Sequence, residues 1–496
     1  MILVPFDYQL EAISDLRGAR GRGQRRLLLC MLMGAGKSLV ALELMRLCQE
    51  KGRRALFLCD RRMLADQIVE RAREQGLHAG QILSGRYPDS SAACQFASRQ
   101  TVDSWLKSGR LTLPEFDLVV TDEAHRAVSD KWQALLGRWP AATLVGLTAT
   151  PCLGNGNGMG AYYDYLCQPI KPSQLLALGR NVPVRAFAPH VPKLKGVKKD
   201  ANGDYQAKSL SERMRRENMV GGVADWWLKL AHGRPSIYFA CDVAHAMQIV
   251  EEFRKAAVSA ELICDETPDD ERASIQRRLS LGHLEVVVNC DVLCEGVDWP
   301  FVSCIGLVRP TKRLRRYLQA AGRGMRAAEG KTDMILIDHA GCVLYHGFPD
   351  EDRLWPLSPD DNVDKQKAAE KKEVRPIRCA QCHHIFKGRI CPACGHVNAA
   401  TRKASDGARG NGTLVEATRN ELSPEESRTL MQRFWYVCIG TSIKLERHAG
   451  MAAGMFSKKF GIPPWQAGVT PMPDSWKMPA CDAFPGFVRK KEVVAE

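Results

Sequence analysis

The chain has 496 residues, which is too many for one hydrophobic core, so two to four domains are expected. Its 45% hydrophobic and 25% charged residues are typical of folded globular protein and exclude broad disorder. The net charge of +14 favours a polyanionic partner, nucleic acid before an acidic membrane, although charge alone is weak evidence.

The start of the chain lacks the basic region of a secretory signal, and it includes an acid at Asp7. No apolar run approaches the roughly 18 residues that a membrane span requires, so we expect no membrane partner. Most of the 18 cysteines stand singly in apolar runs, such as Cys30, Cys59 and Cys241, where a reduced thiol behaves as a small hydrophobe. This usage predicts a reducing, cytoplasmic compartment.

Short apolar runs alternate with helical stretches along most of the chain. In the first part the runs lie at 27–33, 55–59, 95–98, 116–121 and 143–148. The pattern returns at 236–240, 262–264, 284–289, 302–308 and 334–338. Continuous apolar runs are typical of buried parallel strands, and their alternation with helices predicts two α/β lobes, each with a doubly wound sheet.

Composition divides the rest of the chain. A proline-dotted segment with a basic stretch joins the lobes, and polar sequence, a cysteine cluster and a glycine-rich stretch follow the second lobe. The predicted domains are a first lobe at 1–168, an interlobe connector at 169–232, a second lobe at 233–345, a linker at 346–376, a cysteine module at 377–397, and a linker with a C-terminal accessory region at 398–496.

Residues 33–38 read MGAGKS, directly after the first apolar run and before a helical stretch. In such a loop the backbone N–H groups of Gly34, Ala35 and Gly36 converge on phosphate oxygens at a helix N-terminus. Lys37 is then expected at the β- and γ-phosphates of ATP, and Ser38 on Mg²⁺. Because Met31 stands where the strict pattern has glycine, a glycine-rich turn with an incidental lysine is the alternative.

Residues 122–125 read DEAH and end a second strand of the same predicted sheet. Parallel strands present their carboxyl ends along one edge, so this motif and the phosphate loop can face one ligand. Asp122 is expected to hold Mg²⁺ and Glu123 to polarise the attacking water. The alternative, two acids that begin a helix, is weakened by the accompanying phosphate loop.

These motifs resemble those of the superfamily 2 DEAD/DEAH-box helicases, whose fold is two tandem RecA-like lobes, and further signatures of that family appear in order. They are a Q-like motif at 6–9, motifs Ia and Ib at 58–62 and 99–101, motif III at 148–151, motif IV at 238–240, motif V at 295–298 and motif VI at 319–326. The resemblance implies that Gln9 reads the adenine edge and that Gly296 and Asp298 join the nucleotide site. It also implies that motifs Ia and Ib grip the nucleic-acid backbone.

Of the motifs in this resemblance, motif VI has the clearest physical role. Arg323 and Arg326 are three residues apart on a helical turn, and they are expected to reach the γ-phosphate across the cleft as arginine fingers. Such a finger contributes on the order of 10³ or more in rate, because charge develops on the transferred phosphoryl group. A solvated basic helix face is the alternative interpretation, which the spacing of glutamine, glycine and arginine in the motif disfavours.

Within this superfamily the chain resembles the bacterial RadD-like group, which includes phage and prophage relatives. The supporting stretches lie at 264–272, 309–311 and 330–341, and a cysteine-rich module after the second lobe also fits. This resemblance implies DNA as the partner, single-stranded or branched, and a role in repair, recombination or replication alongside other proteins of those processes.

Four cysteines form two pairs with metal-ligand spacing: Cys379 and Cys382, then Cys391 and Cys394. Four thiolates suit tetrahedral Zn²⁺ at about 2.3 Å per bond. A piece of roughly 20 residues cannot bury enough core alone, so the metal is expected to supply its folding energy. A redox dithiol and an iron–sulfur site are the alternatives.

The sequence therefore predicts an ATP hydrolase that requires ATP and Mg²⁺, carries Zn²⁺ and acts as a DNA-dependent ATPase, helicase or translocase. An RNA helicase would keep every motif. A nucleotide-switch scaffold that recruits partners through its zinc module is a second alternative, although intact Lys37, Asp122, Glu123, Arg323 and Arg326 argue against it.

Overall fold

The computed structural model describes residues 3–60, 62–86, 89–189, 191–200, 203–216, 222–294, 298–363 and 375–398. All of them belong to one compact unit, residues 1–401. Gly296 and residues 399–496 of the predicted C-terminal region lie outside the described residues.

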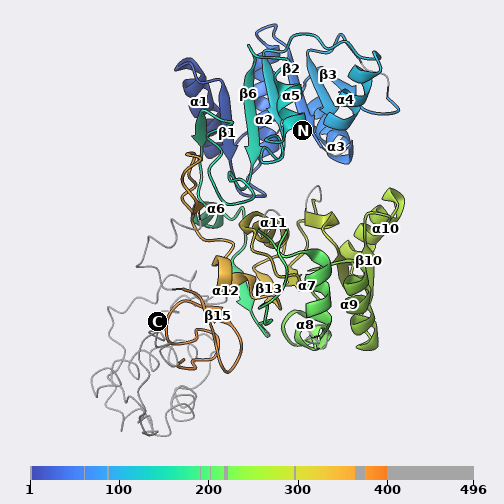
Figure 1. Cartoon of the computed structure of the whole chain (residues 1–496), viewed down its shortest axis with the longest axis vertical. Coiled ribbons are helices and arrows are strands. Elements are labelled where there is room, and N and C mark those ends of the chain that lie inside the picture. Colours follow the sequence, from blue (N-terminus) through green and yellow to red (C-terminus); the bar gives the residue numbers. More distant parts are fainter. Residues whose placement is uncertain are drawn as a thin grey trace, which may run out of the picture. The chain divides into compact units, whose positions relative to one another are not determined.

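The first lobe is built on a seven-stranded sheet with the order β3-β4-β2-β5-β6-β1-β7, in which every neighbouring pair is parallel (Figure 1). Its elements are α1 (Asp7–Gly21), β1 (Arg26–Cys30), α2 (Lys37–Gln49), β2 (Ala55–Cys59), α3 (Arg62–Glu74), β3 (Ala79–Ile82), β4 (Cys94–Ser98), α4 (Arg99–Lys107), β5 (Leu118–Thr121), α5 (Asp130–Leu136), β6 (Thr143–Thr148) and β7 (Tyr165–Cys167).

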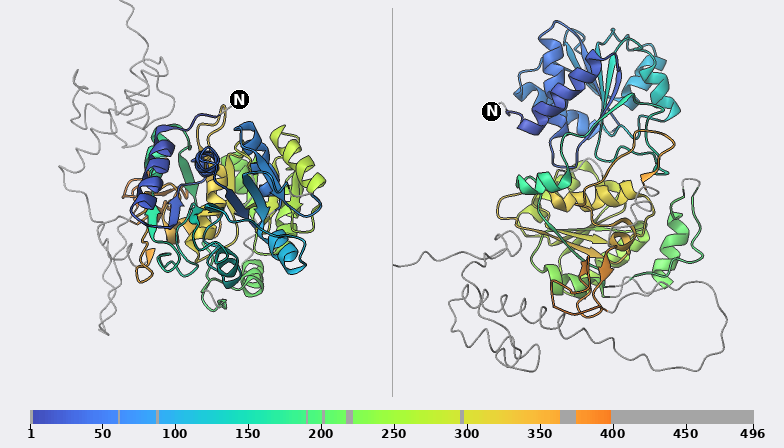
Figure 2. Two further views of the ribbon diagram at one scale, coloured as in Figure 1. Left: turned by 90° about the horizontal axis from the view of Figure 1, so that it is seen from above. Right: turned by 90° about the vertical axis from the view of Figure 1, so that its left-hand side faces the viewer.

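Both faces of this sheet are covered by helices (Figure 2). Side chains alternate along β1, so Leu27 and Leu29 pack into one buried cluster with α1 and α2, whereas Leu28 packs into another with α5. Burial on both sides explains why these strands appear in the sequence as unbroken apolar runs.

The second lobe has a six-stranded parallel sheet with the order β10-β11-β9-β12-β13-β8. Its elements are α8 (Val223–Ala231), β9 (Ser236–Phe239), α9 (Val243–Lys255), β10 (Ala260–Ile263), α10 (Asp269–Ser280), β11 (Val286–Asn289), the 3₁₀ helix η1 (Val292–Cys294), β12 (Cys304–Leu307), α11 (Leu314–Met325), β13 (Met334–Asp338) and α12 (Cys342–His346). The prediction of two doubly wound lobes is confirmed, and each of the ten predicted runs overlaps a strand.

The segment predicted as an interlobe connector contributes more than a link. It forms α6 (Pro172–Ala177), β8 (Val184–Phe187) and α7 (Ala207–Arg216), and β8 completes the second sheet by pairing with β13. Just before β8, the Val182 N–H donates to Met325 O at 2.9 Å, which fastens the connector to the end of α11. The boundaries of this segment stay a prediction.

The predicted linker after the second lobe returns to the first lobe. The Gly160 N–H donates to Leu357 O at 2.6 Å, and the Gly158 N–H donates to Asp361 O at 3.1 Å. We call residues 357–361 the strap, because they join the loop after β6 to the chain that leaves the second lobe.

The cysteine module pairs β14 (Ile377–Arg378) with β15 (Ile385–Phe386) in an antiparallel hairpin. It lies against β8, where the Ala188 N–H donates to His383 O at 2.9 Å and the rings of Phe187 and His384 are 5.1 Å apart. Within the described part of the chain, no helix is both long and apolar enough to cross a bilayer.

Candidate functional site

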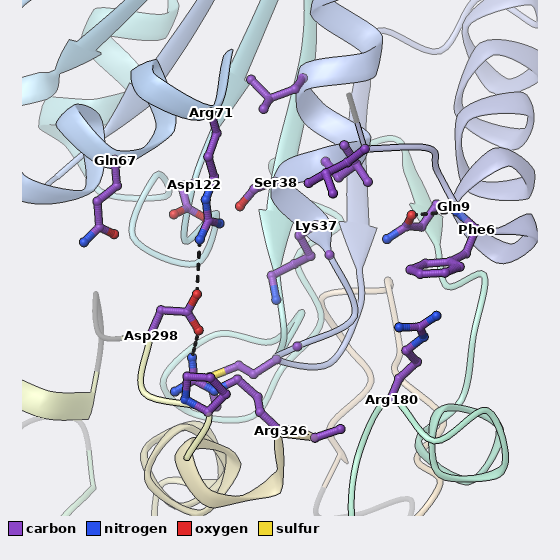
Figure 3. Close-up of a pocket in the computed structure, with 18 of the residues that line it drawn as sticks. Phe6, Gln9, Lys37, Ser38, Gln67, Arg71, Asp122, Arg180, Asp298 and Arg326 are labelled. Atoms are coloured by element: carbon purple, nitrogen blue, oxygen red, sulfur yellow. Dashed lines mark hydrogen bonds and ion pairs between the residues drawn. The ribbon is translucent and has the colours of Figure 1, made fainter. Parts of the chain in front are cut away.

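A cavity of about 540 Å³ lies where the two lobes face each other, and it collects most of the predicted site residues (Figure 3). Those that line it are Gln9, Gly34, Gly36, Lys37, Ser38, Asp122, Glu123, Asp298, Arg323 and Arg326. The first seven come from the first lobe and the last three from the second, so the cavity depends on both lobes.

The phosphate loop connects the buried strand β1 to α2. Gly34 and Gly36 have φ of +84° and +82°, a left-handed conformation that glycine adopts without strain. Lys37 folds back over the loop and donates to Met31 O at 3.0 Å. Burial lowers the pKa of Lys37, whereas Glu123 and Asp122 act in the opposite direction. A triphosphate would offer this buried cation better acceptors than the carbonyl.

Gln9 is buried, and both the oxygen and the nitrogen of its side-chain amide form hydrogen bonds. Its Oε1 accepts from the Phe6 N–H, and its Nε2 donates to Ala35 O, both at 2.9 Å. Ala35 O also accepts from the Tyr8 hydroxyl at 3.1 Å. The Q-like segment is therefore joined directly to the phosphate loop, and Ala35 takes part in that junction.

The acids of the DEAH motif lie where β5 ends. The Glu123 N–H donates to Asp122 Oδ1 at 3.0 Å, and Glu123 itself has φ of +49°, which is unusual for a side-chain-bearing residue. His125 Nδ1 is 3.3 Å from Glu123 Oε2 and 3.4 Å from Thr148 Oγ1. Burial lowers the pKa of His125 well below its ordinary value, so a neutral imidazole connects the acidic motif to motif III.

The two motif VI arginines enter the cavity from the C-terminal end of α11. Arg323 donates from both Nε and Nη2 to Cys294 O, at 3.2 and 2.6 Å. Arg326 forms an ion pair with Asp298, whose other carboxylate oxygen accepts from Arg71 of α3 at 3.1 Å. Burial lowers the pKa of Arg326 to about 10, and neighbouring Arg323 adds to the effect. Both guanidinium groups thus lie in the cavity with Lys37.

The residue expected to grip a nucleic-acid backbone in motif Ib is already paired. Arg99 donates to Asp60 at 3.2 Å and to Asp103 at 2.5 Å, and Asp60 also accepts from Arg126 at 3.1 Å. The side chain of Arg99 is 16% exposed, so a phosphate would have to compete with two carboxylates for it.

The four predicted metal ligands come together in the cysteine module, with their sulfur atoms all within 4.8 Å of one another. Cys379 and Cys394, and likewise Cys382 and Cys391, have sulfurs 3.6 Å apart. A tetrahedron with bonds of about 2.3 Å has edges of roughly 3.8 Å, so the arrangement fits Zn²⁺. Burial acts to raise the pKa of Cys379, but backbone N–H groups of Cys382 and Gln381 and nearby thiols outweigh it and lower that pKa to about 7.

Comparison with known proteins identifies the two lobes. Residues 2–153 match the family described as the res subunit of type III restriction enzymes, and residues 223–328 match the helicase conserved C-terminal domain. The chain belongs to the superfamily 2 helicases. The predictions of an ATP hydrolase and of this superfamily are confirmed, whereas the narrower resemblance to the RadD-like group stays a prediction.

Individual relatives match about seven tenths of the chain. A 51.5 kDa protein of a Lactococcus phage is 29% identical over 73% of this helicase and 76% of the phage protein. A Schizosaccharomyces pombe protein that carries the name of a mitochondrial ATP-dependent helicase, irc3, is 26% identical over 71% of the chain. The helicase spans only 60% of that relative's length. A fragment assigned to the HsdR subunit of a type I restriction enzyme from Vibrio vulnificus shares the fold, with a TM-score of 0.56, 22% identity and coverage of 72% of this chain and 68% of that one.

Several residues that line the helicase's cavity were not predicted. Arg71 and Gln67 come from α3, Arg180 comes from the connector, and Phe6 precedes α1. Of these, only Phe6 fell inside a recognised motif. The other three stand in segments without a sequence signature, and only the folded arrangement brings them to the nucleotide site.

Proposed function

We propose that this helicase couples ATP hydrolysis to movement along DNA. The observation that carries the proposal is the shared cavity, in which Lys37, Asp122 and Glu123 of the first lobe face Arg323 and Arg326 of the second. Hydrolysis that needs groups from both lobes depends on how closely the lobes approach. A cycle of hydrolysis is then also a cycle of interlobe motion.

The residues divide the chemistry among them. Lys37 and the loop N–H groups bind the phosphates, and Ser38 and Asp122 would hold Mg²⁺, which neutralises charge on the phosphate oxygens. Glu123 orients the attacking water. For Arg323 and Arg326 to stabilise the transferring phosphoryl group, they must exchange Cys294 O and Asp298 for phosphate oxygens. Their present partners hold them beside the site until that exchange.

The match of residues 2–153 to a restriction-enzyme family supports DNA over RNA, and a polyanion suits the net charge of +14. We place the activity in repair, recombination or replication, in a cytoplasmic setting. The cysteine module would hold Zn²⁺ and serve as a contact for DNA or for partner proteins. An RNA track and a non-motor nucleotide switch are the competing functions.

The first experiment tests the motor chemistry. We expect Lys37→Ala and Glu123→Gln to abolish ATP turnover while binding to a single-stranded oligonucleotide largely survives, because neither side chain is needed to hold the strand. Steady-state ATPase rates and fluorescence anisotropy measure the two properties. Unchanged ATPase rates in both variants would rule the mechanism out.

The second experiment identifies the track. ATPase rates of the full chain are compared with single-stranded DNA, duplex DNA, forked DNA and single-stranded RNA of matched length. Greater stimulation by DNA supports the proposal, and a forked or single-stranded preference identifies the structure that it engages. Greater stimulation by RNA would establish the RNA helicase instead. Turnover that no nucleic acid changes would favour the nucleotide switch.

A further inference from the structure

Arg180 of the connector covers the ring of Phe6 at the edge of the nucleotide cavity (Figure 3). The guanidinium carbon lies 3.7 Å from the ring centroid. This is van der Waals contact, so nothing else fits between the two groups, and a cation over an aromatic face is attracted to it. Phe6 is still 40% exposed with the guanidinium in place, so the residue lies at the surface, where a ligand can approach its ring.

Phe6 lies at the end of the cavity where a nucleobase would lie. Its backbone N–H is held by Gln9, which in turn donates to Ala35 O of the phosphate loop. In Figure 3, Phe6 and Gln9 lie on one side of Lys37, the residue expected at the phosphates. A nucleobase is a flat π-system that stacks on aromatic rings and on guanidinium planes. Phe6 therefore offers a stacking surface, and Arg180 occupies it in this structure.

The backbone of Arg180 is fastened to the end of motif VI. Its carbonyl accepts from the Ala327 N–H at 3.3 Å, and the Val182 N–H donates to Met325 O at 2.9 Å. Between these two bonds, Asn181 forms a β-bridge with Arg326. A short β-ladder thus joins Arg180, which covers the Phe6 ring, to the backbone of the arginine finger Arg326.

We propose that Arg180 is a positioning residue that communicates occupancy of the nucleobase site to Arg326. The ligand class is a purine nucleoside triphosphate, because the larger base gives the greater stacking area. A base that stacks on the covered face of Phe6 must displace the guanidinium by about 3.5 Å, the thickness of one aromatic layer. The ladder then carries this displacement to residues 325–327 and moves Arg326 from Asp298 toward the γ-phosphate. This inference rests on the proposed ATPase function.

The test compares kcat and KM of the full chain with ATP and with ribose 5-triphosphate, which lacks the base. In the wild type, kcat with ATP should exceed kcat with ribose 5-triphosphate by about tenfold, in line with a cation–π contact. Arg180→Ala should remove that difference by lowering kcat with ATP and leaving kcat with ribose 5-triphosphate unchanged. Arg180→Lys, which keeps the cation, should restore part of it.

Arg22→Ala is the matched control, because Arg22 lies 5.4 Å from the ring centroid of Tyr165 and does not line the cavity. It should retain wild-type values. Should Arg180→Ala fold poorly, Phe6→Leu tests the same contact from its other side and should give the same loss of discrimination in kcat. A rise in KM for ATP with unchanged kcat would overturn the inference, as would an equal loss of kcat with both substrates.

The failure of this inference is distinguishable from the failure of the proposed function. A wild-type chain without nucleic-acid-stimulated ATPase activity would end the proposed function. If the wild-type chain has this activity and Arg180→Ala has the same kcat with ATP as the wild type, only the inference about Arg180 fails.

Discussion

At the scale of single residues, Asp298 is the point where the two lobes and the arginine finger meet. It pairs with Arg326, whose side chain is 11% exposed, and with Arg71 of the first lobe, whose side chain is 52% exposed. An exposed ion pair contributes about 0–1 kcal/mol, because solvent screens it. A nearly buried guanidinium that loses its carboxylate partner is left with an uncompensated charge.

We therefore expect unequal effects from the two ends of this network. Asp298→Ala should lower kcat at least tenfold and the free energy of unfolding by about 1–3 kcal/mol, because Arg326 is left beside Arg323 without that carboxylate. Arg71→Ala should change kcat by less than about fivefold and the free energy of unfolding by less than about 1 kcal/mol. High salt should mask its effect. Steady-state kinetics and urea unfolding measure both. Equal effects of the two variants would show that Asp298 does not set the position of Arg326.

Lys331 is a second residue whose burial bears on motif VI. Its Nζ donates to Pro300 O at 3.0 Å, to Val302 O at 2.5 Å and to Arg326 O at 2.8 Å, so it joins the chain that follows motif V to the backbone of Arg326. Burial lowers the pKa of Lys331 to about 7, and Arg326 and Arg234 add to the shift.

This lowered pKa predicts a pH-dependent contribution to stability. Below about pH 7 the folded and unfolded states both carry the ammonium, and its burial opposes folding. Between about pH 7 and the ordinary lysine pKa of about 10.4, the folded state binds fewer protons, so its stability should rise with pH. The free energy of unfolding of wild type relative to Lys331→Met should therefore increase across this range. Lys51→Met, at an exposed lysine, is the control, and a flat difference would contradict the shift.

At the scale of elements, the strap is held by a close approach of two backbones. At Gly160 the N–H donates to Leu357 O at 2.6 Å, and at Gly158 a Cβ would overlap the carbonyls of Leu357 and Ser358. Backbone cannot move aside as the end of a flexible side chain can. Contact with the strap thus explains the glycines at 158 and 160 of the glycine-rich sequence 154–160.

Gly158→Ala should therefore loosen the strap, at a cost of about 1–3 kcal/mol in the free energy of unfolding. Gly154→Ala is a matched control in the same loop, since a Cβ there meets nothing within 4 Å. Thermal unfolding and limited proteolysis near residues 357–361 measure the effect. If both variants behave like the wild type, the strap does not depend on the close contact between its backbone and Gly158.

The cysteine module is the second element whose role can be tested, because it covers β8 at the edge of the second sheet. We expect removal of Zn²⁺ by a chelator, or Cys382→Ser, to lower the melting temperature and to speed amide exchange in β8, because the module's hairpin has little core of its own. ATP affinity should be unchanged. Metal analysis should give one zinc per chain, and Cys264→Ser, outside the module, should behave like the wild type. Visible absorbance from bound iron would establish the iron–sulfur alternative instead.

At the scale of the whole molecule, sequence predicted the features that repeat or that follow a motif, and it missed those created by tertiary contact. The ten apolar runs correspond to strands because burial on both faces demands continuous apolar residues. Within the two lobes, β3, β7 and β8 were missed, since each has only three or four residues and gives too short an apolar run. Among the described residues, every member of the predicted ATP site except Ala35 lines one cavity, because motif spacing fixes which strand ends hold them. Arg180 and Arg71 had no such signal.

The charge of the molecule bears on how tightly it holds its track. A net charge of +14 gives a net attraction to a polyanion, yet Asp60 and Asp103 engage Arg99 of motif Ib, and Asp60 also engages Arg126. Each carboxylate lowers the number of cations available to phosphates. The strand-binding strength should therefore be limited locally by Asp60 rather than by the overall charge.

Asp60→Asn tests this limit, because it removes the carboxylate and keeps a side chain of similar shape. It should tighten binding to single-stranded DNA and steepen the dependence of log K on log salt by up to about 0.7 for each additional phosphate that the protein neutralises. Asp15→Asn, which also removes one negative charge from the first lobe but hydrogen-bonds Tyr165 instead of a motif arginine, is the control for net charge alone. Anisotropy titrations over a range of salt concentrations measure the slope. If the two variants shift it equally, the net charge decides the affinity and Arg99 stays with its carboxylates when DNA binds.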